Sequence, residues 1–226
     1  MTKYLIHGGG MDSTLMFAIV LIEEKKSPKR EPIVLVHIDY GQLAAPFERT
    51  AVMEQVKWAE NSGLDVSVVH LDTTHIQKTG MLFTGNHQHS PEIPDRNGQL
   101  LDVFFDALPH VNRCWVGADP VPEGRTPMVD CTKEYFAVYE ELRYAKTGVM
   151  VKVIPMFLNI TWDIFNQTMR LMIEHSKYGQ LMELAMTCWT PKPGPTIRDN
   201  HCGHCAHCQK YMKYYGVKLG EDNGNA

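Results

Sequence analysis

Short apolar runs alternate with longer segments of helical periodicity along most of the chain. The apolar runs predict strands near residues 3–7, 33–38, 66–71, 114–116 and 150–154. The periodic segments predict helices near 13–26, 46–62, 98–108, 132–146 and 161–177. Because strands and helices alternate, we expect an α/β fold with a parallel five-stranded sheet and helices on both faces.

Two segments interrupt this alternation. Residues 72–97 contain several His and Pro residues with little periodicity, which predicts a long loop of the kind that often carries function. Residues 188–208 are also loop-like, with prolines between cysteines. In open parallel sheets, ligands bind beyond the carboxyl ends of the strands, at the point where strand order reverses. We therefore expect the candidate motifs, which follow strands, to lie at that edge.

The size and charge of the chain narrow the functional classes. Its 226 residues suit one domain, 1–226, and its net charge of −4 does not favour direct binding of nucleic acid. No apolar run approaches the ~20 residues that cross a bilayer, and the first residues lack the apolar stretch of a signal peptide. We expect a cytoplasmic protein without a membrane partner, acting on a small molecule, whose six cysteines are thiols or metal ligands.

A glycine-rich turn follows the first predicted strand. Residues 6–14 read Ile-His-Gly-Gly-Gly-Met-Asp-Ser-Thr and lead directly into a helical run. Glycines let the backbone approach a phosphate, and the free N–H groups of a first helical turn bind anions. Asp12 or Ser13 is a natural cap for that turn. The pattern favours a phosphate site; the alternative is an ordinary glycine-rich strand–helix turn.

Four cysteines near the carboxyl terminus have the spacing of metal ligands. Cys202, Cys205 and Cys208 recur every three residues, and Cys188 lies fourteen residues upstream. This pattern predicts a tetrahedral Cys₄ zinc site within 188–210, with free or redox thiols as the alternative. Three nearby histidines are alternative ligands, but because four thiolates complete the ligand shell we expect these histidines to be exposed loop residues. These are His201, His204 and His207.

Five segments, in this order, carry a resemblance to a known family. They are Gly-Gly-Gly-Met-Asp-Ser at 8–13, Asp-Tyr-Gly-Gln at 39–42, Ile-Pro-Asp-Arg-Asn-Gly at 93–98, the region 117–136 with Asp119 and Asp130-Cys131, and the cysteine-rich end. With these motifs the chain resembles the 7-cyano-7-deazaguanine (preQ0) synthase family, QueC, among the PP-loop ATP pyrophosphatases. The resemblance covers nearly the whole length and implies a Rossmann-like PP-loop fold.

The chain departs from the family pattern at several positions. Gly8 stands where the phosphate loop of the family has a serine, and Glu48 sits one place late after Gln42. Residues 159–162 read Asn-Ile-Thr-Trp where a basic patch is expected, and Thr132 rather than Arg follows Cys131.

The resemblance implies adenylation chemistry with ATP, Mg²⁺ and Zn²⁺. ATP would activate 7-carboxy-7-deazaguanine as an acyl-adenylate, ammonia would give the amide, and a second ATP would give the nitrile preQ0. A homodimer is also implied. The resemblance assigns nucleotide binding to His7, Gly8, Gly9, Gly10, Met11, Asp12, Ser13, Asp39 and Gln42. It assigns substrate binding to Arg96, Asn97, Asp119, Asp130 and Cys131, and catalysis to Asp12, Ser13 and Arg96.

Other interpretations stay open. In one, the enzyme stops at the amide. In another, it attaches a deazapurine to a protein partner. In a third, the chain is a nucleotide-binding subunit that does not turn over ATP. For single residues, the alternatives are turn formation by Asp39 and Gln42, a surface ion pair for Arg96, and packing in the core for Cys131. Asp12, Asp119 and Asp130 each have helix capping as the alternative role.

Overall fold

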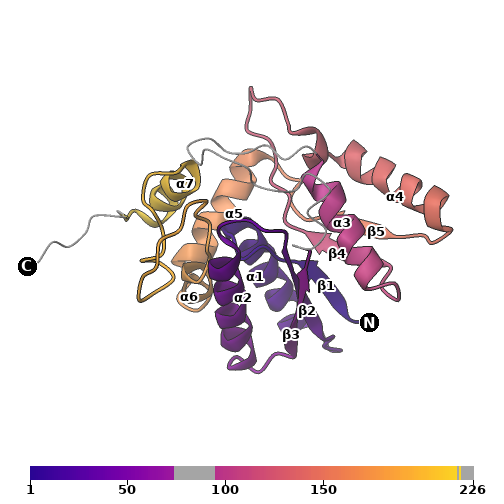
Figure 1. Cartoon of the computed structure of the whole chain (residues 1–226). Helices are drawn as coiled ribbons and strands as arrows, with labels where there is room; N and C mark the ends of the chain where they lie inside the picture. The colour runs from indigo at the N-terminus through magenta and orange to yellow at the C-terminus, as the bar shows by residue number, and fades with distance from the viewer. Residues whose placement is uncertain (74–94, 218, 220–226) are drawn as a thin grey trace, which may run out of the picture.

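The described part of the chain forms one five-stranded parallel sheet (Figure 1). The computed structural model describes residues 1–73, 95–217 and 219. The strand order is β3-β2-β1-β4-β5. The strands are β1 Lys3–Ile6, β2 Ile33–Asp39, β3 Val66–Asp72, β4 Arg113–Val116 and β5 Lys152–Pro155. All five predicted strands are confirmed, with ends displaced by at most two residues.

The predicted helices are present, and two further helices follow them. The helices are α1 Met11–Lys26, α2 Ala45–Glu60, α3 Arg96–Ala107, α4 Lys133–Thr147, α5 Trp162–Glu174, α6 Tyr178–Glu183 and α7 Ala206–Tyr215, with a 3-10 turn, η2, at Val129–Cys131. The helix predicted over 161–177 ends early because His175 is extended and its Nδ1 accepts the Lys177 N–H at 3.1 Å. The segment 188–208, predicted as a loop, contains the start of α7.

Helices cover both faces of the sheet, as predicted (Figure 1). Residues that alternate along a strand point to opposite faces. Leu5, Ile33 and Leu35 belong to the larger core, which they share with buried residues of α1, α2, α5, α6 and α7. Val36 and Ile38 belong to a second core with residues of α3 and α4. The helices thus form two layers, and each layer packs its apolar side chains against one face of the sheet.

Strand order reverses at β1, the central strand. β2 pairs with one edge of β1 and β4 with the other, both in parallel. The connections that leave the carboxyl ends of β1 and β4 therefore lead to helices on opposite faces of the sheet, and open parallel sheets bind ligands at such a reversal. The loop predicted over 72–97 begins with the last residue of β3, and its residues 74–94 lie outside the described part of the chain.

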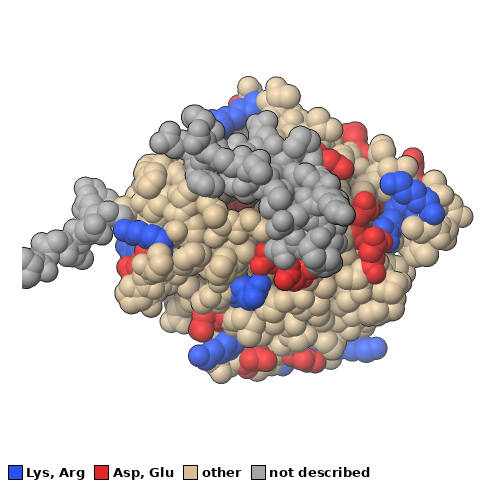
Figure 2. All heavy atoms as spheres, in the orientation of Figure 1, with Lys and Arg blue, Asp and Glu red and all other residues tan. Residues whose placement is uncertain are grey.

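Charged side chains of both signs are interspersed on the face shown in Figure 2. Across residues 1–73 and 95–217, none of the helices combines the length and the apolar character needed to cross a membrane.

Candidate functional site

The glycine turn leads from β1 into an uncapped helix. Gly10 is the N-cap of α1, with φ −78° and ψ 174°, and no side chain caps the first turn. The prediction that Asp12 or Ser13 caps α1 is therefore wrong: both lie in the first turn, and Ser13 Oγ donates to the Gly10 carbonyl at 3.0 Å. A helix start without a side-chain cap leaves backbone N–H groups to a ligand, and the helix dipole favours an anion there.

The shape of this turn depends on Gly9. Its φ of +76° is rarely adopted by other residues, and a Cβ there would lie 3.0 Å from the Glu48 carbonyl oxygen. The Gly9 N–H donates to Nδ1 of His7 at 3.0 Å. Burial lowers the pKa of His7 to about 3, so the ring is neutral and Nδ1 can accept. The buried His7 side chain thus fixes the backbone of the glycine turn through this hydrogen bond.

Three charged side chains meet beside the first turn of α1. Nζ of Lys210 lies 3.1 Å from Oδ1 of Asp12 and 2.8 Å from Oδ2 of Asp119. Burial alone would lower the pKa of Lys210, but the two carboxylates outweigh it and raise that pKa, so the lysine is charged. Burial and the neighbouring Asp12 raise the pKa of Asp119. Two carboxylates that converge on one cation have the arrangement that also suits a divalent metal.

Gly117 allows Asp119 to come this close. It follows β4, and a Cβ at this position would lie 3.1 Å from the backbone of Asp12 and Ser13. The loop after β4 therefore passes directly over the start of α1. This close approach brings together Asp12 and Asp119, which lie more than a hundred residues apart in the sequence.

The Asp-Tyr-Gly-Gln segment forms a tight turn after β2. Oδ1 of Asp39 accepts the Gly41 N–H at 3.0 Å, and Oε1 of Gln42 accepts the Tyr40 N–H at 2.9 Å. Oδ2 of Asp39 also pairs with Arg49 at 2.8 Å. These contacts are the turn chemistry that the sequence left as the alternative for Asp39 and Gln42. Contact of either side chain with a nucleotide stays a prediction.

A carboxyl group with an unusual pKa lies next to this turn. Oε2 of Glu48, in the first turn of α2, accepts the Nε2–H of Gln42 at 2.7 Å. Burial raises the pKa of Glu48 to about 7, and Asp39 adds to this, while Gln42 and Arg96 oppose it. Arg96, at the start of α3, also interacts with the Tyr40 hydroxyl. The described groups around Arg96 are thus polar side chains next to this turn, and its contact with a substrate stays a prediction.

The remaining predicted substrate residues lie together between α3 and η2. The Asn97 N–H donates to Oδ2 of Asp130 at 3.1 Å, and Asn97 Nδ2 donates to the Asp130 carbonyl at 2.8 Å. The same Nδ2 lies 3.3 Å from Sγ of Cys131. Cys131 is half-buried and free, whereas the cysteine in β4, Cys114, is fully buried as expected for a core residue.

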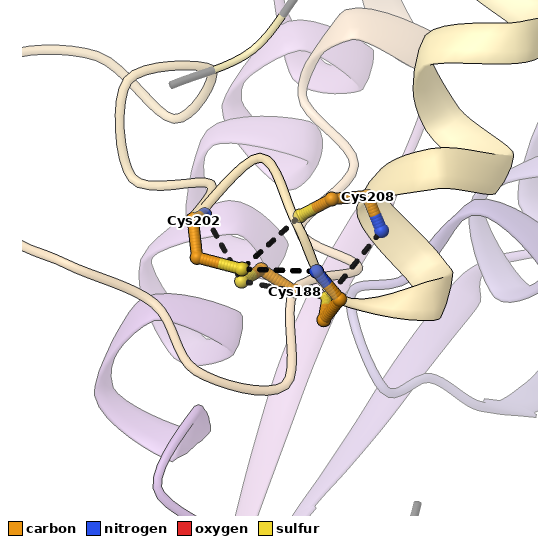
Figure 3. Close-up of side chains that lie close together, drawn as sticks. Cys188, Cys202 and Cys208 are labelled. Carbon is orange, nitrogen blue, oxygen red and sulfur yellow. Dashed lines mark hydrogen bonds between the residues drawn. The ribbon is translucent and has the colours of Figure 1, made fainter. Parts of the chain in front are cut away.

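The four cysteines converge on one point at the start of α7 (Figure 3). Their sulfur atoms all lie within 4.8 Å of one another. Sγ of Cys202 lies 3.8 Å from that of Cys208, and Sγ of Cys205 lies 4.0 Å from that of Cys188. Four sulfurs that share one ion at ~2.3 Å in a tetrahedron lie about 3.8 Å apart. The cluster therefore fits a single metal ion with four thiolate ligands.

The histidines around this cluster differ from the expectation. His204 is exposed, as predicted, but His201 is buried and its Nε2 accepts the Thr187 N–H at 3.4 Å. His207 is half-buried, and its Nδ1 lies 3.2 Å from the Thr187 hydroxyl. The prediction fails for these two because the segment packs back onto residues 186–188 instead of extending into water.

The structure thus gathers the predicted residues into neighbouring groups and adds two residues to them. Asp12, Ser13 and Asp119 lie at the glycine turn, and Arg96 lies beside the turn after β2. Lys210 and Glu48 had no predicted role. Lys210 follows the last cysteine by two residues, and no local pattern links it to Asp12. Glu48 had two signals, an acidic residue at the start of a predicted helix and a position one place away from the family pattern after Gln42.

A comparison with family profiles decides the family. The profile described as "Queuosine biosynthesis protein QueC" matches residues 3–216. The chain belongs to the QueC family. Members of this family are PP-loop enzymes that use ATP and act on small molecules. A comparison with curated proteins finds no match.

Among solved structures, the chain is similar to the "U34-tRNA thiolase NcsA from Methanococcus maripaludis with its [4Fe-4S] cluster". The two share 14% sequence identity with a TM-score of 0.43, and the alignment covers 96% of this chain and 70% of that chain. A likeness at this level gives no information on the reaction or the metal of this QueC-family chain.

Proposed function

We propose that this QueC-family protein converts 7-carboxy-7-deazaguanine and ammonia to preQ0 at the expense of ATP. The observation that carries the proposal is the uncapped first turn of α1 at the reversal of strand order, with Asp12 and Asp119 beside it. An anion-binding helix start next to carboxylates suits the polyphosphate of ATP together with a cation.

ATP would be held at the glycine turn. Backbone N–H groups at the start of α1 and the Ser13 hydroxyl would contact its phosphates. Asp12 and Asp119 are the carboxylates available for Mg²⁺, which when bound offsets the charge of the polyphosphate. Asp39 and Gln42, beyond β2, would lie toward the adenosine.

The acid to be activated would lie between α3 and η2. Asp130 and Asn97 offer hydrogen-bond acceptors and donors of the kind that a guanine-like base requires, and Arg96 suits its carboxylate. Glu48, with a pKa of about 7, exchanges protons near neutral pH, which suits the amide and nitrile steps because each releases a proton. Most of the rate would come from positioning and charge stabilisation.

Product mass and AMP count test the proposal together. The purified protein is incubated with carboxy-deazaguanine, ammonium and MgATP, and products are read by mass spectrometry. The nitrile with two AMP per product is expected, since each activation consumes one ATP. The amide with one AMP would show that the enzyme stops early. Intact ATP would overturn the proposal in favour of a nucleotide-binding subunit, and a mass shift on a co-purified protein would favour attachment to a partner.

We also propose that the four-cysteine cluster binds one zinc ion with a structural role. The sulfur separations of 3.8 Å and 4.0 Å suit one ion, whereas an iron–sulfur cube holds each cysteine on a different iron and so keeps the sulfurs farther apart. Metal analysis of protein purified without chelator should find about one zinc per chain. A brown protein that contains iron and acid-labile sulfide would overturn this assignment.

A further inference from the structure

The carboxyl-terminal helix carries a lysine to the glycine turn. Nζ of Lys210, on α7, lies 3.1 Å from a carboxylate oxygen of Asp12 and 2.8 Å from one of Asp119. The same atom lies 5.9 Å from the ring centre of Trp162 and 5.6 Å from that of Phe165. The ammonium is therefore held in place by two carboxylates and lies near two aromatic rings, while the side chain stays 27% exposed.

Among the described residues, Lys210 is the cation that contacts the carboxylates at the glycine turn. Residues 156–161, which connect β5 to α5, contain neither Lys nor Arg. Arg96 interacts with Tyr40 and Glu48, near the turn after β2. In the described part of the chain, Lys210 is the one basic side chain that pairs with Asp12 or Asp119. A polyphosphate at α1 would thus find its nearest fixed ammonium on α7.

We propose that Lys210 is a catalytic residue that binds the polyphosphate of ATP, and that the four-cysteine centre positions it. The inference rests on the proposed function, because it requires a nucleotide at the glycine turn. α7 begins directly after Cys205, whose Sγ caps the helix by accepting the Cys208 N–H at 3.4 Å. Cys205 is therefore both a predicted metal ligand and the N-cap of α7, and Lys210 lies in the second turn of this helix.

A second contact ties the metal centre to the glycine turn. The Met186 N–H donates to the Gly9 carbonyl at 2.8 Å, and Cys188 follows two residues later. Residues 186–210 therefore contact the glycine turn through the Met186 N–H and its neighbouring carboxylates through Lys210. Displacement of this segment would disturb both contacts at once.

The proposed role follows from the charge that develops during adenylation. A substrate carboxylate oxygen bonds to the α-phosphorus, the bond from that phosphorus to the bridging oxygen breaks, and the electron pair leaves with pyrophosphate. A fixed ammonium beside the phosphates offsets this charge without transferring a proton. Oδ1 of Asp119 is buried without a hydrogen-bond partner among the described residues, so the cluster can accept a further donor or cation.

Three variants test the role of the lysine. Lys210→Met removes the charge and keeps the stem, Lys210→Arg keeps the charge, and Lys213→Met removes an exposed charge one turn along the same helix. MgATP affinity is measured by calorimetry without deazaguanine, together with metal content and the thermal midpoint. We expect binding to weaken about tenfold or more in Lys210→Met alone, largely restored in Lys210→Arg, at unchanged metal content.

AMP release then separates binding from catalysis. A charge that acts on the transition state lowers kcat as well as affinity, by about a hundredfold in Lys210→Met. If Lys210→Met binds MgATP within about threefold of the wild type, or if Lys213→Met weakens binding equally, the proposal is overturned. Because affinity is measured with MgATP alone, failure to convert carboxy-deazaguanine would overturn the proposed function and leave this result standing.

Metal removal tests the positioning step. At chelator concentrations that leave the far-ultraviolet spectrum unchanged, amide hydrogen exchange should rise in 206–215, and MgATP affinity of the wild type should fall. In Lys210→Met the same treatment should change the affinity much less, because the contact is already lost. An equal loss of affinity in both proteins would show that the metal centre does not act through Lys210.

Discussion

The carboxyl group of Glu48 should make the folding stability of the protein depend on pH in a measurable way. Its carboxyl group is half-buried at the start of α2, and one oxygen accepts the Nε2–H of Gln42 at 2.7 Å. Burial raises the pKa of Glu48 from 4.5 to about 7; Asp39 contributes to the increase, and Gln42 and Arg96 limit it. In the folded protein this group therefore binds its proton more tightly than in the unfolded chain.

The sign of the effect follows from this difference. Between pH 4.5 and pH 7 the folded state holds a proton that the unfolded state has released, so folding stability decreases as pH rises through this range. At about 1.4 kcal/mol for each change of one in pKa, the increase from 4.5 to about 7 corresponds to roughly 3.5 kcal/mol of folding free energy. From pH 5 to pH 8, Glu48 should lower the free energy of unfolding by about 2.5 kcal/mol.

The substitution Glu48→Gln isolates this contribution. Glutamine keeps the shape and an oxygen that accepts from Gln42, but it carries no charge at any pH. Urea unfolding of the ligand-free wild type and variant at pH 5, 6, 7 and 8 gives two curves of stability against pH. Other groups are common to both proteins, so their difference should change by about 2.5 kcal/mol in favour of the variant at pH 8.

The control is Glu54→Gln, an exposed position of the same helix. Its difference from the wild type should stay within about 0.5 kcal/mol over the whole range. Parallel curves for Glu48→Gln and the wild type would refute the reasoning, because they would mean that the Glu48 carboxylate is as easily formed in the folded protein as in the unfolded chain.

Three other predictions concern the turn and the metal centre. A Cβ at Gly8 would have no atom within 4 Å, so Gly8→Ser should keep MgATP affinity within about threefold of the wild type. Gly9 has φ +76°, which other residues rarely adopt, so Gly9→Ser should lower the free energy of unfolding in urea by about 1–2 kcal/mol and weaken MgATP binding. Asp12→Asn should lower AMP release about a hundredfold at an unchanged thermal midpoint; normal release would remove Asp12 from the chemistry. Cys205→Ser should lose bound metal and about 3 kcal/mol, a decrease of roughly 6–12 °C in calorimetry, and retention of one ion per chain would contradict its role as a ligand.

The fold was predictable because its signals are local. The apolar runs of β2 and β3 and the apolar spacing of α2 each report burial within a single element, and the chain order of the elements implies a parallel sheet. Gly216, which ends α7 in the left-handed conformation at φ 62°, is a local helix-stop signal that lies beyond the predicted loop 188–208. The short helix α6 is harder to predict, since its six residues span less than two turns.

The site was predictable only in part because its contacts are long-range. The motifs place Asp12 and Asp119 beyond neighbouring strands, where the topology brings them together. The ion pair from Lys210 to Asp12 spans 198 residues, and it depends on how a metal-binding segment folds back over the sheet. The pKa of Glu48 likewise depends on burial between a turn and a helix, which the order of residues does not express.

The hydrogen bond from Met186 to Gly9 joins two segments that lie far apart in the sequence, and Lys210 lies farther along still. A chain truncated before residue 186 would keep all five strands of the sheet but would lack both the amide that supports the glycine turn and the lysine beside it.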